Sequence, residues 1–170
     1  MTEEQISIGC LGTNLIIIPE GHITAFLCPG LKARIMEELG PDSALRAIHF
    51  DFASCLYMDS TFLGLIVFLV KTARSLGINR PVVHKSTTEC KSLFRTMGMM
   101  KMLDFSEEAS PQPETKEKIL ARASLSAGFL YEVHKELSDL SAENQGRFSS
   151  LTKELESIAG FQEGTNGLDD

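Results

Sequence analysis

Three side chains that carry oxygen, Asp59-Ser60-Thr61, immediately precede the most apolar stretch of the chain, residues 62–70. A carboxylate or hydroxyl here is a good N-cap, because its oxygen accepts the free N–H groups of a first helical turn. The same place favours a phosphate on a hydroxyl, since those N–H groups and the helix dipole stabilise added negative charge. The spacing leaves two interpretations open: a structural cap, or a phosphorylated serine beside Asp59.

The hydrophobic pattern places this cluster between a strand and a helix. Alternation predicts a strand over residues 47–52, a loop over 53–59, and a well-buried helix from Ser60 to Ser75 that Gly77 ends. The other predicted elements are strands over 7–11, 14–19 and 80–84, a strand or extended segment over 103–105, and helices over 29–39 and 88–96. This alternation indicates an α/β structure with helices on a central sheet.

The motif Met58-Asp59-Ser60-Thr61-Phe62-Leu63-Gly64 resembles the M-D-S-S-G-L-G motif of STAS domains, the family of bacterial anti-sigma factor antagonists. The resemblance covers roughly residues 6–106. Within it, residues 15–24 look like the family's first long strand and its G-x-L/I-D turn, and residues 82–98 look like its late strand and helix. The resemblance implies the STAS fold: a small, mostly parallel sheet with an antiparallel edge strand, backed by helices.

The resemblance also implies a phospho-switchable regulatory binding protein. In the antagonist branch, the unphosphorylated domain binds a GHKL-type anti-sigma factor serine kinase, and a sigma factor is released. The kinase then phosphorylates the serine after the motif aspartate, and a PP2C-type phosphatase resets it. Ser60 matches that phosphoacceptor, and Thr61 is the less favoured alternative. The phosphosite neighbourhood expected to bind the partner is Thr24, Met58, Asp59, Thr61, Phe62 and Gly64.

Two positions depart from the family pattern. Thr24 stands where the turn often ends in an aspartate near the phosphosite, and Phe62 replaces a small residue after the serine pair. Phe62 is either a core residue or part of an altered partner-docking surface. Both departures favour an alternative function, an unphosphorylated STAS scaffold or a small-ligand-sensing module in a bacterial signalling complex.

Composition and motif content argue against other classes. The longest apolar run has nine residues, whereas a membrane span needs about 20. The polar, acidic N-terminus is unlike an export signal, so we expect a cytoplasmic protein. Neither half has the basic excess of a nucleic-acid binder. No GxSxG, P-loop, dinucleotide-glycine pattern or clustered metal ligands occur, so we expect no enzyme, cofactor or metal, and mostly buried free cysteines.

The last third of the chain differs in charge. Residues 1–105 hold ten basic and ten acidic side chains, so residues 106–170 carry the whole net charge of −7. We predict a STAS domain over 1–106, a linker over 107–115, a C-terminal helical extension over 116–158 and a disordered tail over 159–170. The family's antagonists end near the position of Phe105, so the resemblance says nothing about this extension.

A narrow stripe of mostly apolar residues, here called the seam, runs along the predicted C-terminal helix. Its spacing shifts after Asn144 by one extra step of four residues, which is a stutter in the heptad pattern. Its members are Leu130, Val133, Leu137, Leu140, Asn144, Phe148, Leu151, Leu155 and Ile158. The seam has two interpretations. The helix packs on the STAS domain, or it forms a homodimer or docks on a partner helix through residues 116–158.

Overall fold

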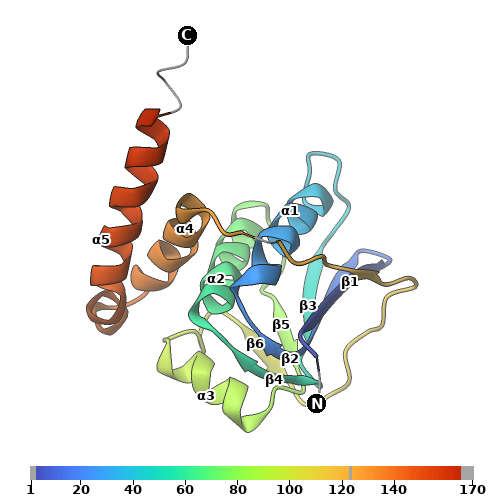
Figure 1. Cartoon of the computed structure of the whole chain (residues 1–170). Helices are drawn as coiled ribbons and strands as arrows, with labels where there is room; N and C mark the ends of the chain where they lie inside the picture. Colours follow the sequence, from blue (N-terminus) through green and yellow to red (C-terminus); the bar gives the residue numbers. More distant parts are fainter. Residues whose placement is uncertain (1–2, 123, 166–170) are drawn as a thin grey trace.

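The structure is a computed structural model that describes residues 3–122 and 124–165, without the side chains of 161–165. Its strands are β1 (Gln5–Leu11), β2 (Asn14–Ile23), β3 (Ala47–Asp51), β4 (Cys55–Met58), β5 (Val82–His84), β6 (Asp104–Ser106) and β7 (Glu117–Lys118). Its helices are α1 (Cys28–Glu38), which the short 3-10 turn η1 (Ala25–Leu27) precedes, α2 (Ser60–Ser75), α3 (Thr88–Thr96), α4 (Ala127–Ser138) and α5 (Ala142–Thr165). Figure 1 shows α4 and α5 as a pair beside α2, on the side away from the sheet's β1 edge.

The strands form one mixed sheet in the order β6-β5-β3-β2-β1-β7, and β4 pairs with the far end of β2. Strands β2, β3, β5 and β6 are parallel, whereas β1 pairs antiparallel with both β2 and β7. The turn between β1 and β2 uses Gly12 at φ +59°, a conformation that glycine adopts at little cost. The predicted parallel sheet with an antiparallel edge is confirmed.

The core lies between the sheet and the helices, and aromatic rings fill its centre. Phe52 from the end of β3 stacks on Phe62 of α2, with ring centroids 6.5 Å apart, and contacts Phe94 of α3 at 5.6 Å. All three rings are fully buried. Cys28, Cys55 and Cys90 are buried free thiols, and Cys10 is half-buried.

One element near the site differs from prediction. The segment predicted as a loop contains β4, which pairs with β2 through Ile23 and Met58. Its two end residues are buried, whereas Leu56 and Tyr57 between them are exposed. Its sequence lacks the alternation of apolar and polar residues that predicts a strand. The segment is a strand because it pairs with β2.

The prediction of one helix over residues 116–158 is wrong. Residues 117–118 form β7 on the free edge of β1, and the first helix begins only at Ala127. A second helix begins at Ala142, because the Ser141 hydroxyl accepts the N–H of Asn144 at 3.0 Å and caps a new first turn. The predicted disordered tail is helical over residues 159–165, and 166–170 lie outside the described residues.

The chain between β6 and α4 is bound to the domain along its length. The Glu114 N–H donates to Cys10 O, the Ile119 N–H to Ile6 O, and the Arg122 N–H to Phe26 O. This segment crosses from β6 to the β1 edge and then passes α1, which brings α4 beside α2 (Figure 1). The predicted linker over 107–115 therefore includes residues that hydrogen-bond to the sheet, while the division into domains remains a prediction.

Candidate functional site

Asp59 is the N-cap of α2, as one interpretation of the cluster predicted. Its backbone is extended, and its Oδ1 accepts the N–H of Phe62 at 3.0 Å. Its own N–H donates to Ile23 O at 3.0 Å, which fixes the turn from β4 into the helix. Burial raises the pKa of Asp59, while hydrogen bonds from the N–H groups of Phe62, Ala25 and Thr61 act in the opposite direction.

The three residues after the cap differ in exposure. Ser60, the first residue of α2, is half-buried, whereas Thr61 and Phe62 are buried. Phe62 stacks on Phe52, so it is the core residue of the two interpretations and not part of a docking surface. Of the two hydroxyls, the one at Ser60 is therefore the more accessible.

The Ser60 hydroxyl contacts a histidine that lies 74 residues further along the chain. Ser60 Oγ is 2.9 Å from His134 Nε2, and His134 Nδ1 is 2.7 Å from Leu130 O. A carbonyl only accepts, so Nδ1 carries a hydrogen, and in the neutral ring Nε2 accepts the hydrogen of Ser60. His134 is only 4% exposed, and the Phe148 ring of α5 lies 5.9 Å from its ring centre. Sequence reasoning missed His134, because no local pattern connects it to Ser60.

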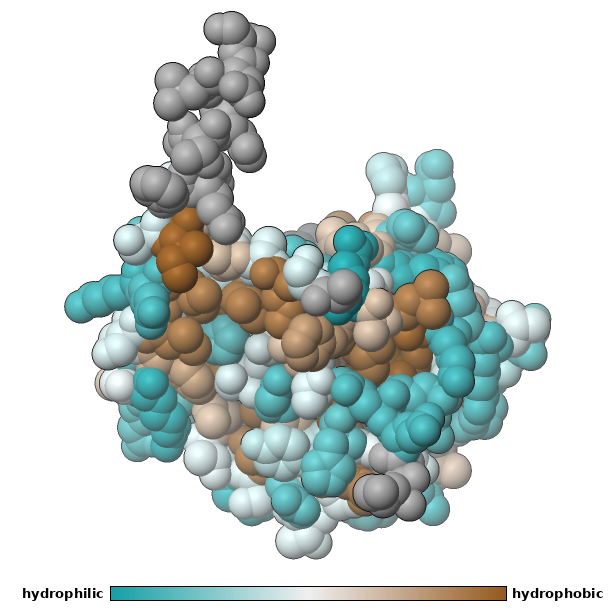
Figure 2. Space-filling model, in the orientation of Figure 1, coloured by the Kyte–Doolittle hydropathy of each residue, from teal (hydrophilic) through white to brown (hydrophobic). Residues whose placement is uncertain are grey.

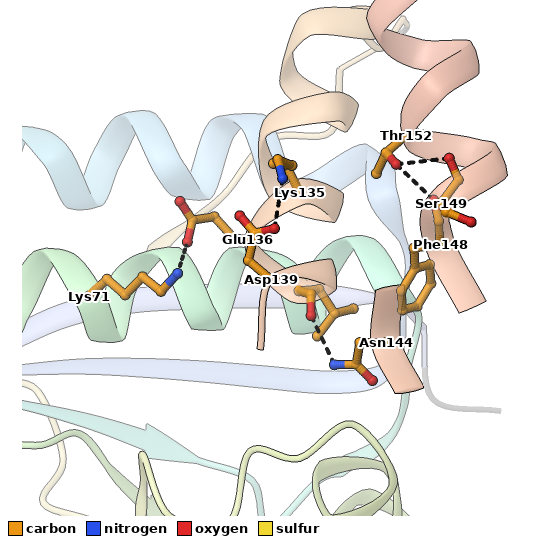
Figure 3. A network of polar contacts seen from close by, with 9 residues as sticks. Lys71, Lys135, Glu136, Asp139, Asn144, Phe148, Ser149 and Thr152 are labelled. Atoms are coloured by element: carbon orange, nitrogen blue, oxygen red, sulfur yellow. Dashed lines mark hydrogen bonds and ion pairs between the residues drawn. The ribbon is translucent and has the colours of Figure 1, made fainter. Parts of the chain in front are cut away.

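Helix α4 packs directly on α2 next to this contact. A Cβ at Gly64 would lie 2.2 Å from the carbonyl oxygen of Val133, so the two backbones meet where only glycine fits. Val133 and Leu137 are fully buried. Ion pairs flank the contact: Lys32 Nζ is 2.8 Å from Glu132 Oε2, and Lys71 pairs with Glu136, as Figure 3 shows.

Asn144 fastens the start of α5 to both neighbouring helices. Its buried amide Nδ2 donates to Leu137 O at 2.9 Å and to Met97 O, at the end of α3, at 3.0 Å. Arg147 donates to Asn144 Oδ1 at 2.9 Å and to Thr96 O at 3.2 Å. Figure 3 shows Asn144 directed toward α4 from the first turn of α5.

The predicted seam is thus largely buried within the chain. Its α4 residues pack on α2, and Phe148 and Leu155 of α5 are also buried. Packing on the domain is the interpretation that the structure supports for α4. Leu151 and Ile158 of α5 remain 38% and 43% exposed, and Figure 2 shows apolar side chains in a band that runs from α5 toward the middle of this face. A homodimer stays a prediction, and these residues are where it would form.

The other predicted site residues divide into three groups. Thr24 directly follows Ile23, the last residue of β2, whose carbonyl oxygen accepts the N–H of Asp59. Met58 is buried in the core like Phe62, and Gly64 is covered by α4. The N–H and hydroxyl of Thr24 both donate to Glu4 Oε1 at 2.7 Å. Glu4, which sequence reasoning also missed, therefore brings a carboxylate to the turn where the family pattern has an aspartate.

Comparisons with known proteins identify the fold. No family model matches the sequence, and no curated protein matches it. Among solved structures, the chain is similar to the anti-sigma factor antagonist SpoIIAA in its unphosphorylated form, with a TM-score of 0.54, 15% sequence identity, and coverage of 61% of this chain and 89% of that chain. The chain has the STAS fold. The covered share is close to that of residues 1–106, so the match leaves more than a third of this chain uncovered.

A serine that is hydrogen-bonded to a histidine also provides two of the groups that hydrolases use. A hydrolase needs a hydroxyl, a base and free N–H donors for an oxyanion. Here the N–H of Phe62, in the first turn of α2, already donates to the Asp59 carboxylate. This N–H is therefore engaged by a carboxylate of the chain itself. In residues 3–122 and 124–165, no helix is long and apolar enough to cross a bilayer.

Proposed function

We propose that this chain is a phospho-switchable regulatory binding protein that acts like an anti-sigma factor antagonist, with Ser60 as its phosphoacceptor. One observation carries the proposal: on a STAS fold, Ser60 is the first residue of α2 and has the more accessible of the two adjacent hydroxyls. The dipole of α2 also stabilises negative charge near its N-terminus, where the N–H groups of Thr61 and Phe62 already donate to Asp59. The similarity to SpoIIAA, an antagonist whose structure is of the unphosphorylated form, supports this assignment.

The proposed partner is a GHKL-type anti-sigma factor serine kinase that binds the surface around Asp59 and Ser60. The kinase transfers the γ-phosphoryl group of ATP to Ser60 Oγ, the hydroxyl loses its proton, and ADP leaves. The phosphate brings about 1.5 to 2 negative charges next to the Asp59 carboxylate, and this change in charge releases the kinase. A PP2C-type phosphatase resets the serine. We place this switch in the bacterial cytoplasm, where it would control transcription.

The test is to isolate the full chain from cells that express it and to map its phosphorylation by mass spectrometry. We expect one phosphate, on Ser60, that a PP2C-type phosphatase removes and that a Ser60→Ala variant lacks. A Thr61→Val variant is the control and should still be phosphorylated. Phosphate found only at other positions, or none across growth and stress conditions, would contradict the proposal.

A second candidate function is a STAS scaffold that is not phosphorylated. The contact between Ser60 and buried His134 favours it, because this hydroxyl already has a partner within the chain. The same mapping experiment separates the two candidates. A chain that binds its partners equally well with Ser60→Ala and with Ser60→Asp would be a scaffold.

A further inference from the structure

We infer that α4 and α5 form an intramolecular lid on the phosphorylation site, and that docking of α4 and phosphorylation of Ser60 exclude each other. This inference rests on the proposed function, since it concerns the regulation of the same serine. The lid lies outside the part of the chain that resembles STAS antagonists. It would therefore add to the switch a layer of control that comes from the chain itself.

Steric contact is the first argument. Ser60 Oγ and His134 Nε2 are in direct hydrogen-bond contact at 2.9 Å, which leaves no space between them for a phosphate group. The imidazole cannot turn away, because Nδ1 is held by Leu130 O and the Phe148 ring packs beside it. Nor can α4 move closer to α2, since the Gly64 backbone already meets Val133 O. With the Ser60 side chain in this orientation, a phosphate on Oγ requires α4 to move away.

Charge is the second argument. The lid presents the carboxylates of Glu132 and Glu136 to the domain, where Lys32 and Lys71 pair with them. A phosphate on Ser60 would add negative charge beside the Asp59 carboxylate, on the helix that α4 covers. The two ion pairs hold α4 against α1 and α2, so their loss reports an open lid.

Opening of the lid would break no strand pairing, although Val133, Leu137 and Phe148 contribute to the core of the domain. Its contacts are with helices: α4 packs on α2, and Asn144 and Arg147 at the start of α5 bond to the last carbonyls of α3. The edge pairing of β1 with β7 lies before α4 in the chain and does not depend on these contacts. A kinase that reaches Ser60 would displace α4 from α2, so lid and kinase compete for one surface.

The test uses the full chain with phosphoserine incorporated during translation at position 60. The matched control carries phosphoserine at position 43, an exposed serine between α1 and β3 that lies outside both α2 and the lid. Hydrogen exchange of the α4 amides reports docking, and so do carbodiimide cross-links between Lys32 and Glu132 and between Lys71 and Glu136. We expect phosphoserine at 60 to speed α4 exchange by about tenfold or more and to abolish both cross-links, while exchange in the sheet stays unchanged. The control should match the unmodified chain.

The inference is wrong if the α4 amides stay as protected with phosphoserine at 60 as without it, or become more protected because His134 binds the phosphate. If that protein fails to fold, the double variant Glu132→Lys, Glu136→Lys tests the lid from the opposite side, because it sets lysines against Lys32 and Lys71. In cells that express either protein, we expect the fraction of chains phosphorylated on Ser60 to be several-fold higher for this open variant than for the natural chain. An equal fraction would overturn the inference.

The two proposals fail separately. If Ser60 is phosphorylated in cells but α4 stays docked in the phosphorylated chain, the proposed function stands and the lid is wrong. If phosphoserine at 60 opens the lid but Ser60 is never modified in cells, the proposed function is wrong while the exclusion stands.

Discussion

Helices α2 and α4 meet at Ser60, yet they relate to the sequence in opposite ways. Helix α2 begins and ends at the residues that its pattern predicts, because its signals are local: Asp59 as cap, an apolar run, and Gly77 at φ +72° after its end. The region of α4 is predicted as part of one long helix. Its actual limits are set by contacts with residues that are distant in sequence.

The comparison shows what an unusually apolar helix indicates. A helix that covers one face of a sheet needs one apolar stripe. Helix α2 is buried on nearly all sides because the sheet lies under it and α4 lies over part of it, at Gly64. Apolar residues beyond a single stripe therefore indicate a second covering layer, and α4, which carries the first residues of the seam, is that layer.

The largest expected effect comes from changing the glycine at which the two helices touch. In Gly64→Ala the new Cβ would lie 2.2 Å from the Val133 carbonyl oxygen, so α4 must shift or undock. We expect a loss of about 2–4 kcal/mol in the free energy of unfolding, measured with urea. Gly146→Ala in α5 is the control, because nothing lies within 4 Å of its Cβ, and it should gain about 0.5–1 kcal/mol. Equal small effects at both glycines would mean that α4 does not dock where the structure places it.

The next effect concerns the amide that fastens α5. Asn144→Ala leaves the Leu137 and Met97 carbonyls without their donor in a buried site, and we expect a cost of about 1–3 kcal/mol in urea unfolding. Gln145→Ala, an exposed neighbour on the same helix, should change stability by less than about 0.5 kcal/mol. A negligible effect of Asn144→Ala would show that α5 is held by its apolar contacts alone.

The limits of sequence-based prediction follow the same division between local and distant contacts. The sheet, α2 and the capped turn at Asp59 were predictable because caps, alternation and a family motif are local signals. Strand β7 was not, since Lys116 to Arg122 contains good helix formers and is extended only because the β1 edge offers backbone partners such as Ile6 O. The helix break at Ser141 did have a local signal, because a serine hydroxyl is able to cap the first turn of a new helix.

A smaller effect tests whether the charge or only the oxygen of Asp59 is needed to start α2. Since its pKa is raised, the folded chain binds this proton more tightly than the unfolded chain does. Its contribution to stability is therefore present at a pH below the ordinary value of 3.8 and is lost as the pH rises through the raised pKa. At pH 7 we expect Asp59→Asn, which keeps the capping oxygen, to be at least as stable as the natural chain.

Asp59→Ala is the matched variant, because it removes the capping oxygen as well as the charge. It should cost about 1 kcal/mol in urea unfolding. If Asn were as destabilising as Ala, the negative charge itself would be what stabilises the start of α2.

The smallest effect is expected where the chain leaves the sheet on its way to α4. His49 Nδ1 is 2.9 Å from His84 Nε2, and His84 Nδ1 is 3.2 Å from Glu108 O, so two rings connect β3 to the start of that segment. Burial, with a smaller contribution from the charge of His84, holds the pKa of His49 below its usual value of 6.5. The folded chain therefore binds this proton less tightly than the unfolded chain does.

The sign of the pH dependence follows from that difference. The stabilising contribution of His49 is present above pH 6.5 and is lost as the pH falls through 6.5 toward the lowered pKa. We expect the urea midpoint to fall slightly between about pH 7.5 and pH 5.5, and to fall less in His49→Gln, which has no ring to titrate. Parallel curves for the two proteins would show that His49 does not titrate in this window. Because the ring lies on the sheet, in β3, and not on α2 or α4, hydrogen exchange in α4 should follow the midpoint and show no pH response of its own. A separate response of α4 would mean that the segment after Glu108 transmits the protonation of the sheet to the lid.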